Sequence, residues 1–168
     1  MNMNKIALAA ALAASLPVLA SDPPGFRFRA VLTGSEEVPS VSSSASGELN
    51  MVLGGDGNSI SYTLNFSGLS SAVQQAHIHF AQPAVNGPII IWLCGTTALP
   101  GPAGTPSCPQ AGSVSGVITS AQVLASPATQ QLPAGDLSRA IRLLRNGTGY
   151  ANVHTANSPG GEIRGQVY

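Results

Sequence analysis

The sequence predicts an all-β protein built as a two-sheet antiparallel β-sandwich, with one short helix near residues 136–145. Short segments alternate between apolar and polar residues, and turn-forming residues are frequent, with 19 glycines and 13 prolines among 168 residues. A period of two is typical of strands that bury one face. Many short strands with few helices favour two packed sheets over a helical or mixed fold.

The first half of the chain predicts three strands. Apolar residues alternate along residues 26–33, which indicates a half-buried first strand. The serine-rich residues 40–46 are expected to form a loop. Alternation returns in residues 48–53 and 60–66, and the glycine-rich residues 54–58 between them predict a hairpin turn.

The middle of the chain predicts three further strands. Residues 76–80 form the first of them, and a turn at residues 86–88 leads into the apolar run 89–93. Because this run is apolar on both faces, we expect a central strand that is covered on both sides. The Pro/Gly-rich residues 95–112 are predicted as an excursion, and residues 114–118 as a short strand.

The predicted helix has clear boundaries. Asp136 is a suitable N-cap, Asn146-Gly147 ends the helix, and apolar residues recur between them at helical spacing. These apolar residues are Leu137, Ala140, Ile141 and Leu144. We expect the helix to pack over one end or side of the sheets. Residues 148–154 and 162–168 are predicted as a final pair of strands.

The amino terminus indicates export. Lys5 precedes a short Ala/Leu-rich apolar stretch, and small residues lie near Ala20, which is typical of a signal peptide over residues 1–20. Residues 21–168 are then expected to form one domain in the periplasm or outside the cell. Cys94 and Cys108 are expected to form a disulfide there, and a two-thiolate metal site is the alternative.

Charge and composition exclude several function classes. Charged residues make up 8% of the chain, the formal net charge is zero, and no basic run occurs. Nucleic acids and anionic membrane surfaces are therefore poor partners. After the signal peptide, no segment resembles a transmembrane helix. Hydrolase, phosphate-loop and dinucleotide-binding motifs are also lacking, and we expect no enzymatic turnover.

All three histidines lie in two short segments that are predicted as strands. His77 and His79 project to the same face because side chains alternate along a strand. His154 shares a face with Tyr150 and Asn152. If the two strands are neighbours, three imidazoles can converge on one ion. Neutral imidazole suits copper and zinc, and copper has the higher intrinsic affinity. We expect a copper site, with zinc as the alternative.

The histidine pattern is also compatible with two other interpretations. In a structural or protein-interaction domain they would hydrogen-bond across strands, and another exported protein would be the partner. In a mononuclear copper redox enzyme they would leave an open coordination position. Asn152, Glu162 and Arg164 are candidates for orienting the histidines, and Glu162 and Arg164 can instead pair with each other.

Four motifs together carry a family resemblance. They are the Gln-Ala-His-Ile-His-Phe strand 75–80, the Asn-Gly-Pro-Ile turn 86–89, Tyr-Ala-Asn-Val-His-Thr at 150–155, and Pro-Gly-Gly-Glu-Ile-Arg-Gly-Gln at 159–166. In combination they resemble the CHRD domain, the module repeated in the secreted developmental protein chordin and found singly in bacterial exported proteins. The segment Leu-Thr-Gly-Ser-Glu-Glu-Val-Pro at 32–39 is similar to the opening of that module. The resemblance covers nearly all of residues 26–168.

The resemblance implies an exported β-sandwich but no defined activity. The growth-factor binding of chordin does not transfer to single residues here. The His-x-His strand is also similar to that of copper–zinc superoxide dismutase. That family needs further histidines and a zinc-bound aspartate, so three imidazoles do not suffice for its two-metal site.

Overall fold

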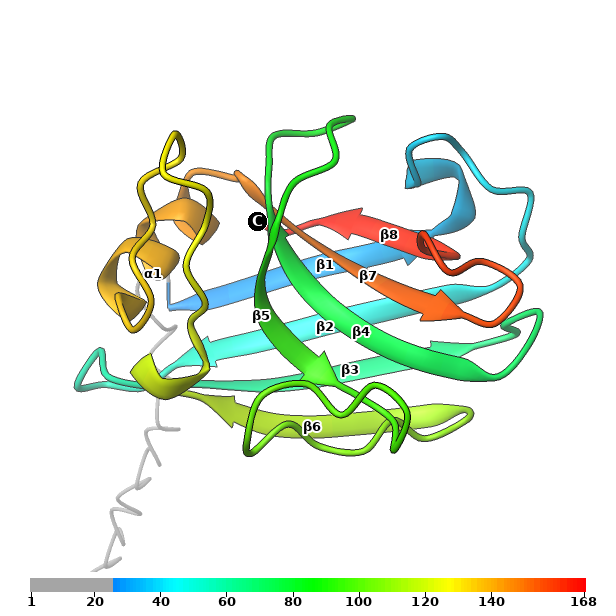
Figure 1. Cartoon of the computed structure of the whole chain (residues 1–168), viewed down its shortest axis with the longest axis horizontal. Coiled ribbons are helices and arrows are strands. Elements are labelled where there is room, and N and C mark those ends of the chain that lie inside the picture. Colours follow the sequence, from blue (N-terminus) through cyan, green and yellow to red (C-terminus); the bar gives the residue numbers. More distant parts are fainter. Residues whose placement is uncertain (1–25) are drawn as a thin grey trace, which may run out of the picture.

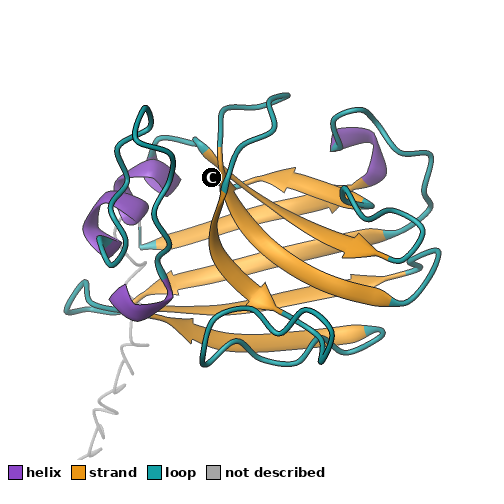
Figure 2. Ribbon diagram, in the orientation of Figure 1, coloured by secondary structure: helices purple, strands orange, loops and turns teal. Residues whose placement is uncertain are grey.

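Antiparallel β-strands are the main regular structure in the described part of the chain (Figure 2). The computed structural model describes residues 26–168, so the predicted signal peptide at 1–20 lies outside the described residues. The strands are β1 (Arg27–Thr33), β2 (Ser46–Leu53), β3 (Ile60–Ser67), β4 (Val73–Phe80), β5 (Ile89–Cys94), β6 (Gly112–Ile118), β7 (Gly149–Thr155) and β8 (Ile163–Gln166). The helices are α1 (Leu137–Arg145) and the short 3₁₀ turns η1 (Gly34–Glu36) and η2 (Ser120–Gln122).

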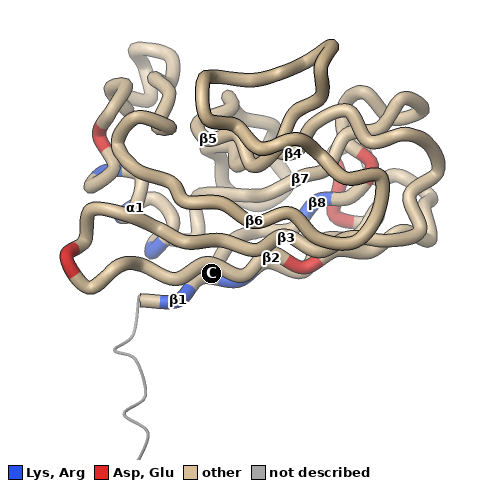
Figure 3. Tube along the Cα trace, turned by 90° about the horizontal axis from the view of Figure 1, so that it is seen from below, with Lys and Arg blue, Asp and Glu red and all other residues tan. Residues whose placement is uncertain are grey.

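The eight strands form two layers that are joined at one edge. Their order is β5-β4-β7-β8-β1-β2-β3-β6, and β5, β4 and β7 cross over β1, β2 and β3 (Figures 1 and 3). The junction between β8 and β1 is narrow: Thr33 pairs with Arg164, and Arg29 and Tyr168 exchange two backbone hydrogen bonds of 2.7 and 3.0 Å. The predicted antiparallel sandwich is therefore confirmed, and its two sheets are continuous.

Alternation along the strands explains the core between the layers. Leu32, Leu49 and Leu64 are fully buried and lie on β1, β2 and β3. The predicted hairpin is confirmed, because β2 and β3 pair from Ser46–Ser67 to Leu53–Ile60. Each buried leucine contributes roughly 1.5–3 kcal/mol relative to an exposed position.

The prediction of a central strand at residues 89–93 was wrong. β5 is the first strand in the sheet order, and among the described strands it pairs only with β4. Its apolar side chains are buried all the same, since Ile90, Ile91 and Leu93 have no exposed area. Other segments cover the free edge: the Leu124 backbone N–H donates to Ile90 O, and the Tyr62 hydroxyl donates to Leu93 O. An apolar run indicates that its side chains are buried. Loops can bury them as well as neighbouring strands can.

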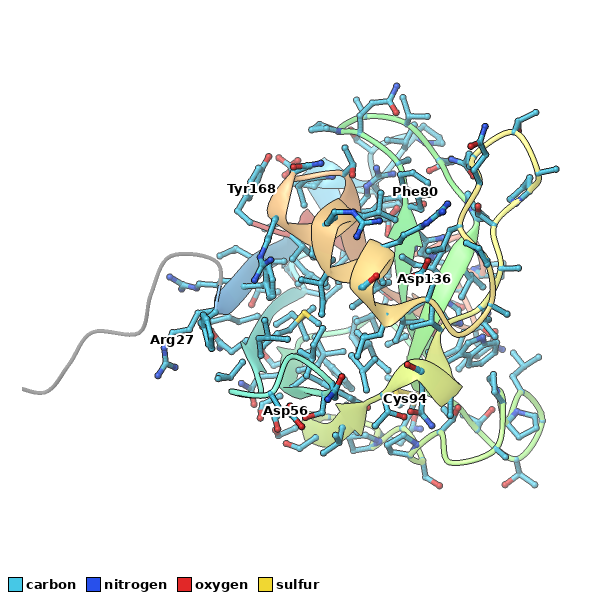
Figure 4. All side chains as sticks on the ribbon, turned by 90° about the vertical axis from the view of Figure 1, so that its left-hand side faces the viewer. Arg27, Asp56, Phe80, Cys94, Asp136 and Tyr168 are labelled. Atoms are coloured by element: carbon cyan, nitrogen blue, oxygen red, sulfur yellow. A yellow bond between two sulfur atoms is a disulfide. The ribbon has the colours of Figure 1, made fainter. Side chains whose placement is uncertain are left out.

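Helix α1 matches its prediction and covers one end of the sandwich. The Asp136 side chain accepts a hydrogen bond from the Arg139 backbone N–H, as an N-cap does. The four apolar residues of its spacing are all buried. Figure 4 views this end, where α1 lies in front of the strands and Asp136 marks its start. Within residues 26–168, no helix has the length and hydropathy needed to cross a bilayer.

A disulfide closes the excursion between β5 and β6. It joins Cys94, the last residue of β5, to Cys108, across a sequence separation of 14 residues. Gly95 lies beside the bridge and hydrogen-bonds to Pro106 and Cys108 through its backbone. The link holds residues 95–108 against the edge of the sheet. Figure 3 shows that charged residues are sparse along the whole described chain, so apolar packing and backbone pairing dominate its stability.

The core between the layers can be tested by truncating one leucine. We expect Leu64→Ala to lower the free energy of unfolding by about 2–5 kcal/mol, because it leaves a cavity at a fully buried position. Urea denaturation measures the change. Val31→Ala serves as the control, since Val31 is 56% exposed and should change stability by less than about 1 kcal/mol. Equal losses in both variants would contradict this core.

Candidate metal centre

The pairing of β4 with β7 brings the three histidines together. In this ladder His77 lies opposite Asn152, His79 opposite Tyr150, and Gln75 opposite His154. All three rings project from the face of these strands that points away from the core. Their nearest nitrogen atoms all lie within 4.8 Å of one another. The structure thus forms a three-histidine group that can hold a metal ion.

Backbone carbonyls fix the tautomers of two rings. The Nδ1 atom of His79 lies 2.9 Å from Gly87 O, and Nδ1 of His154 lies 2.9 Å from Pro159 O. A carbonyl oxygen only accepts, so each Nδ1 carries the proton and donates it. The neutral rings of His79 and His154 therefore have their lone pairs on Nε2, ready to bind an ion.

The distances are close to those of a three-nitrogen site. Nδ1 of His77 and Nε2 of His154 are 3.2 Å apart. Two ligands about 2.0 Å from one ion at a tetrahedral angle are separated by about 3.3 Å. The largest separation in the group, up to 4.8 Å, must contract by about 1.5 Å for all three nitrogens to bind together.

Two imidazole nitrogens are buried without a partner. Within residues 26–168, neither Nε2 of His77 nor Nε2 of His79 has a partner with hydrogen-bond geometry, although the Asn152 amide lies near the His79 ring. The side chains are almost inaccessible, with exposed fractions of 0% for His77 and 7% for His79. An unsatisfied buried polar atom costs roughly 1–3 kcal/mol. A cation bound between the three rings would satisfy Nε2 of His79 and the nitrogen of His77 that faces His154.

Burial keeps the histidines neutral. It lowers the pKa of His77 to about 2, and the neighbouring His154 and His79 add to that shift. Burial also lowers the pKa of His79 to about 4, against the opposing hydrogen bond to Gly87. The pKa of His154 is lowered by burial as well. At neutral pH no proton competes with an ion for these lone pairs.

Aromatic rings enclose two of the histidines. The Trp92 ring stands edge-on to His77, with centroids 4.3 Å apart. The loop closed by the disulfide packs on Trp92. Gly101 of this loop has φ +68°, and it lies so close to the indole that a Cβ there would collide with the ring. The Tyr150 ring stacks on His79 at 4.7 Å with an interplanar angle of 4°. These contacts hold the rings and exclude water from them.

Asn152 and Arg164 lie beside the histidine group. Asn152 Oδ1 is 2.9 Å from Nε2 of His154. Because Pro159 fixes the tautomer of that ring, Nε2 and Oδ1 are two acceptors that face each other, while Nδ2 of the amide lies on the side of Glu37. The Arg164 guanidinium lies 3.4 Å from the Tyr150 ring centroid. Arg164 also donates to Asn86 Oδ1 and Val85 O; these contacts tie the 81–88 loop over the site.

Glu162 lies at a different place. Its carboxylate accepts hydrogen bonds of 2.6–2.8 Å from Ser43, Ser70 and Thr155. Burial opposes ionisation of this group, but these donors outweigh it and hold the pKa of Glu162 below its usual value. In the described part of the chain it bonds neither to Arg164 nor to a histidine. Glu162 therefore links Ser43 and Ser70, which lie in loops, to Thr155 at the end of β7.

The structure adds one group that the sequence did not single out. Glu37, just after η1, is buried, and its Oε1 atom has no partner among the described residues. Its carboxyl faces the amide of Asn152. The only sequence signal was its place in the Glu-Val-Pro opening of the resemblance, which says nothing about spatial position.

The comparison with known families agrees with these motifs. The model of the CHRD domain matches residues 28–167. The chain belongs to the CHRD domain family. The match spans every strand apart from the first residue of β1, and it contains all three histidines and both cysteines. No curated protein and no solved structure matches this CHRD domain chain.

The neutral histidines predict a specific acid sensitivity of this CHRD domain. Below about pH 6.5 the unfolded chain binds protons at its histidines and the folded chain does not, so stability falls as pH falls. We expect His77→Gln to reduce the loss of unfolding free energy between pH 6 and 5 by about 1 kcal/mol.

Urea denaturation at the two pH values, with a metal chelator present, measures this difference. Glu37 acts in the opposite direction over the same range because burial raises its pKa to about 7, but both proteins share that contribution. An identical pH dependence in wild type and His77→Gln would show that His77 is protonated in the folded state.

Proposed function

We propose that this CHRD domain is an exported metal-binding module that holds one transition-metal ion, copper, through His77, His79 and His154. One observation carries the proposal: the Nε2 atoms of His77 and His79 are buried without partners beside a third imidazole. Cross-strand hydrogen bonding alone, the rival reading for a purely structural domain, leaves these two atoms unsatisfied. Cation binding gives Nε2 of His79 a partner and uses the lone pairs of all three neutral rings.

The donor set favours copper, with zinc as the alternative. Three neutral imidazole nitrogens suit both ions, and the intrinsic order of affinity places Cu²⁺ above Zn²⁺. Both cysteines are in the disulfide, so neither offers a thiolate. The bound ion would contribute Lewis acidity and, for copper, one-electron chemistry.

The enclosure of the rings favours binding over turnover. The exposed fractions of the three histidines are between 0 and 7%. A redox enzyme needs an open coordination position that its substrate can reach. Rings and loops cover the three imidazoles, so we assign a role in holding or handling metal.

Export is part of the proposal. A disulfide is typical of an oxidising compartment, and copper handling outside the cytoplasm is compatible with it. The signal peptide over residues 1–20 and the single domain over residues 21–168 belong to the same proposal. Another exported protein that delivers or receives the ion is the expected macromolecular partner.

Metal titration tests the proposal directly. Trp92 is the single tryptophan of the chain, and its ring lies 4.3 Å from the His77 ring. We expect Cu²⁺ to quench its fluorescence in a saturable titration that ends at one ion per chain. Zn²⁺, which has no redox chemistry, should compete with Cu²⁺ for the site. Isothermal titration gives the affinities for Cu²⁺, Cu⁺ and Zn²⁺.

His77→Ala should weaken binding on the order of 100-fold or more, because one of three ligands is lost. Gln74→Ala is the matched control, since Gln74 lies on the same strand outside the group. It should bind like wild type. Equal affinity of His77→Ala and wild type would eliminate the site.

A further inference from the structure

Glu37 is a buried acid with an incomplete set of partners. Its side chain is 5% exposed, and Oε1 has no hydrogen-bond partner within residues 26–168. Burial raises the pKa of Glu37 to about 7, against the opposing charge of Arg164 and hydrogen bonds from Val38 and Asn152. Such a group changes its charge easily when a new charge is placed nearby.

One amide separates Glu37 from the histidine group. A Cβ on Gly161 would collide with Oε1 of Glu37 and would lie 2.9 Å from Nδ2 of Asn152, so all three groups meet at one point. Gly161 has φ +125°, a conformation that suits glycine. The other end of the same amide is 2.9 Å from Nε2 of His154. The carboxyl thus reaches the imidazoles through Asn152.

The charge balance of the site requires an anion. Three neutral imidazoles contribute no negative charge, and the guanidinium of Arg164 is close enough to lower the pKa of both His79 and Glu37. A divalent ion would add two positive charges to this buried region, which is costly without compensation. The buried carboxyls of the described chain are Glu37 and Glu162, and Glu162 is already bound by four donor groups.

We propose that Glu37 is the counter-charge residue of the three-histidine site: its carboxylate, acting across Asn152, offsets the charge of a bound divalent cation. This inference rests on the proposed function. Glu37 is a positioning residue in this scheme and not a ligand. It makes the site favour Cu²⁺ and Zn²⁺ over Cu⁺, which brings one charge fewer.

A cavity at the surface borders Glu37. Its volume is about 220 Å³, and Glu37, Pro39, Ser158 and Gly161 are among its lining residues. When a divalent ion binds, the protonated carboxyl loses its proton to water in this cavity, and the ionised oxygen remains. The charged and titratable groups that face Glu37 are Arg164 from β8, Tyr150 from β7, and His154 through Asn152.

Zn²⁺ affinity at two pH values tests the inference. In competition with a fluorescent chelator, we expect the affinity of wild type to rise about tenfold between pH 6 and 8, as Glu37 ionises. Glu37→Gln should show a flat profile and a lower affinity at pH 8. Its affinity for Cu⁺ should change less than that for Zn²⁺. Glu36→Gln is the matched control, because the neighbouring Glu36 is exposed, and it should behave like wild type.

Proton release gives a second test that needs no variant. Calorimetric titration of wild type with Zn²⁺ in two buffers of different ionisation enthalpy should show release of about one proton per ion at pH 6 and almost none at pH 8. Absence of release at pH 6, or equal pH profiles in wild type and Glu37→Gln, would overturn the role of Glu37. A wild-type protein that binds no ion at either pH would instead overturn the proposed metal site itself.

Discussion

In the register of β4 against β7, His77 lies opposite Asn152 and His79 opposite Tyr150. Every contact of the histidine group depends on this alignment. Because side chains alternate along a strand, a slip by one residue would turn the rings into the core and bring Ala76 and Ile78 outward. Ile78 has no exposed area and packs within the core, so burial on one face fixes the position of the imidazoles on the other.

Loops cover that outer face, so the histidines are buried although they lie outside the core between the layers. Each of three loops contributes one polar group: Glu37 follows η1, Gly87 offers its carbonyl to His79, and Pro159 offers its carbonyl to His154. The sandwich therefore has a hydrophobic core between its layers and a separate polar cluster beneath loops. The apolar core provides the stability that allows two unpartnered nitrogens to persist in the second cluster.

Much of this arrangement could be predicted from local patterns. Alternation identified the strands, and helical spacing with an N-cap at Asp136 identified α1. The shared face of His77 and His79 follows from a period of two. The edge position of β5 could not be predicted, because an apolar run does not say what covers it. Glu37 was missed for a related reason: its approach to Asn152 depends on the loop path and on Gly161, neither of which leaves a periodic signal.

The place of β8 in the sheet has a consequence for biosynthesis. This strand is the last of the eight in sequence, yet it lies in the middle of the strand order, between β7 and β1. The two layers stay unconnected, with open strand edges on both sides, until β8 has been synthesised. These edges favour aggregation in the incomplete chain, and the joining of the two layers is a late event in folding.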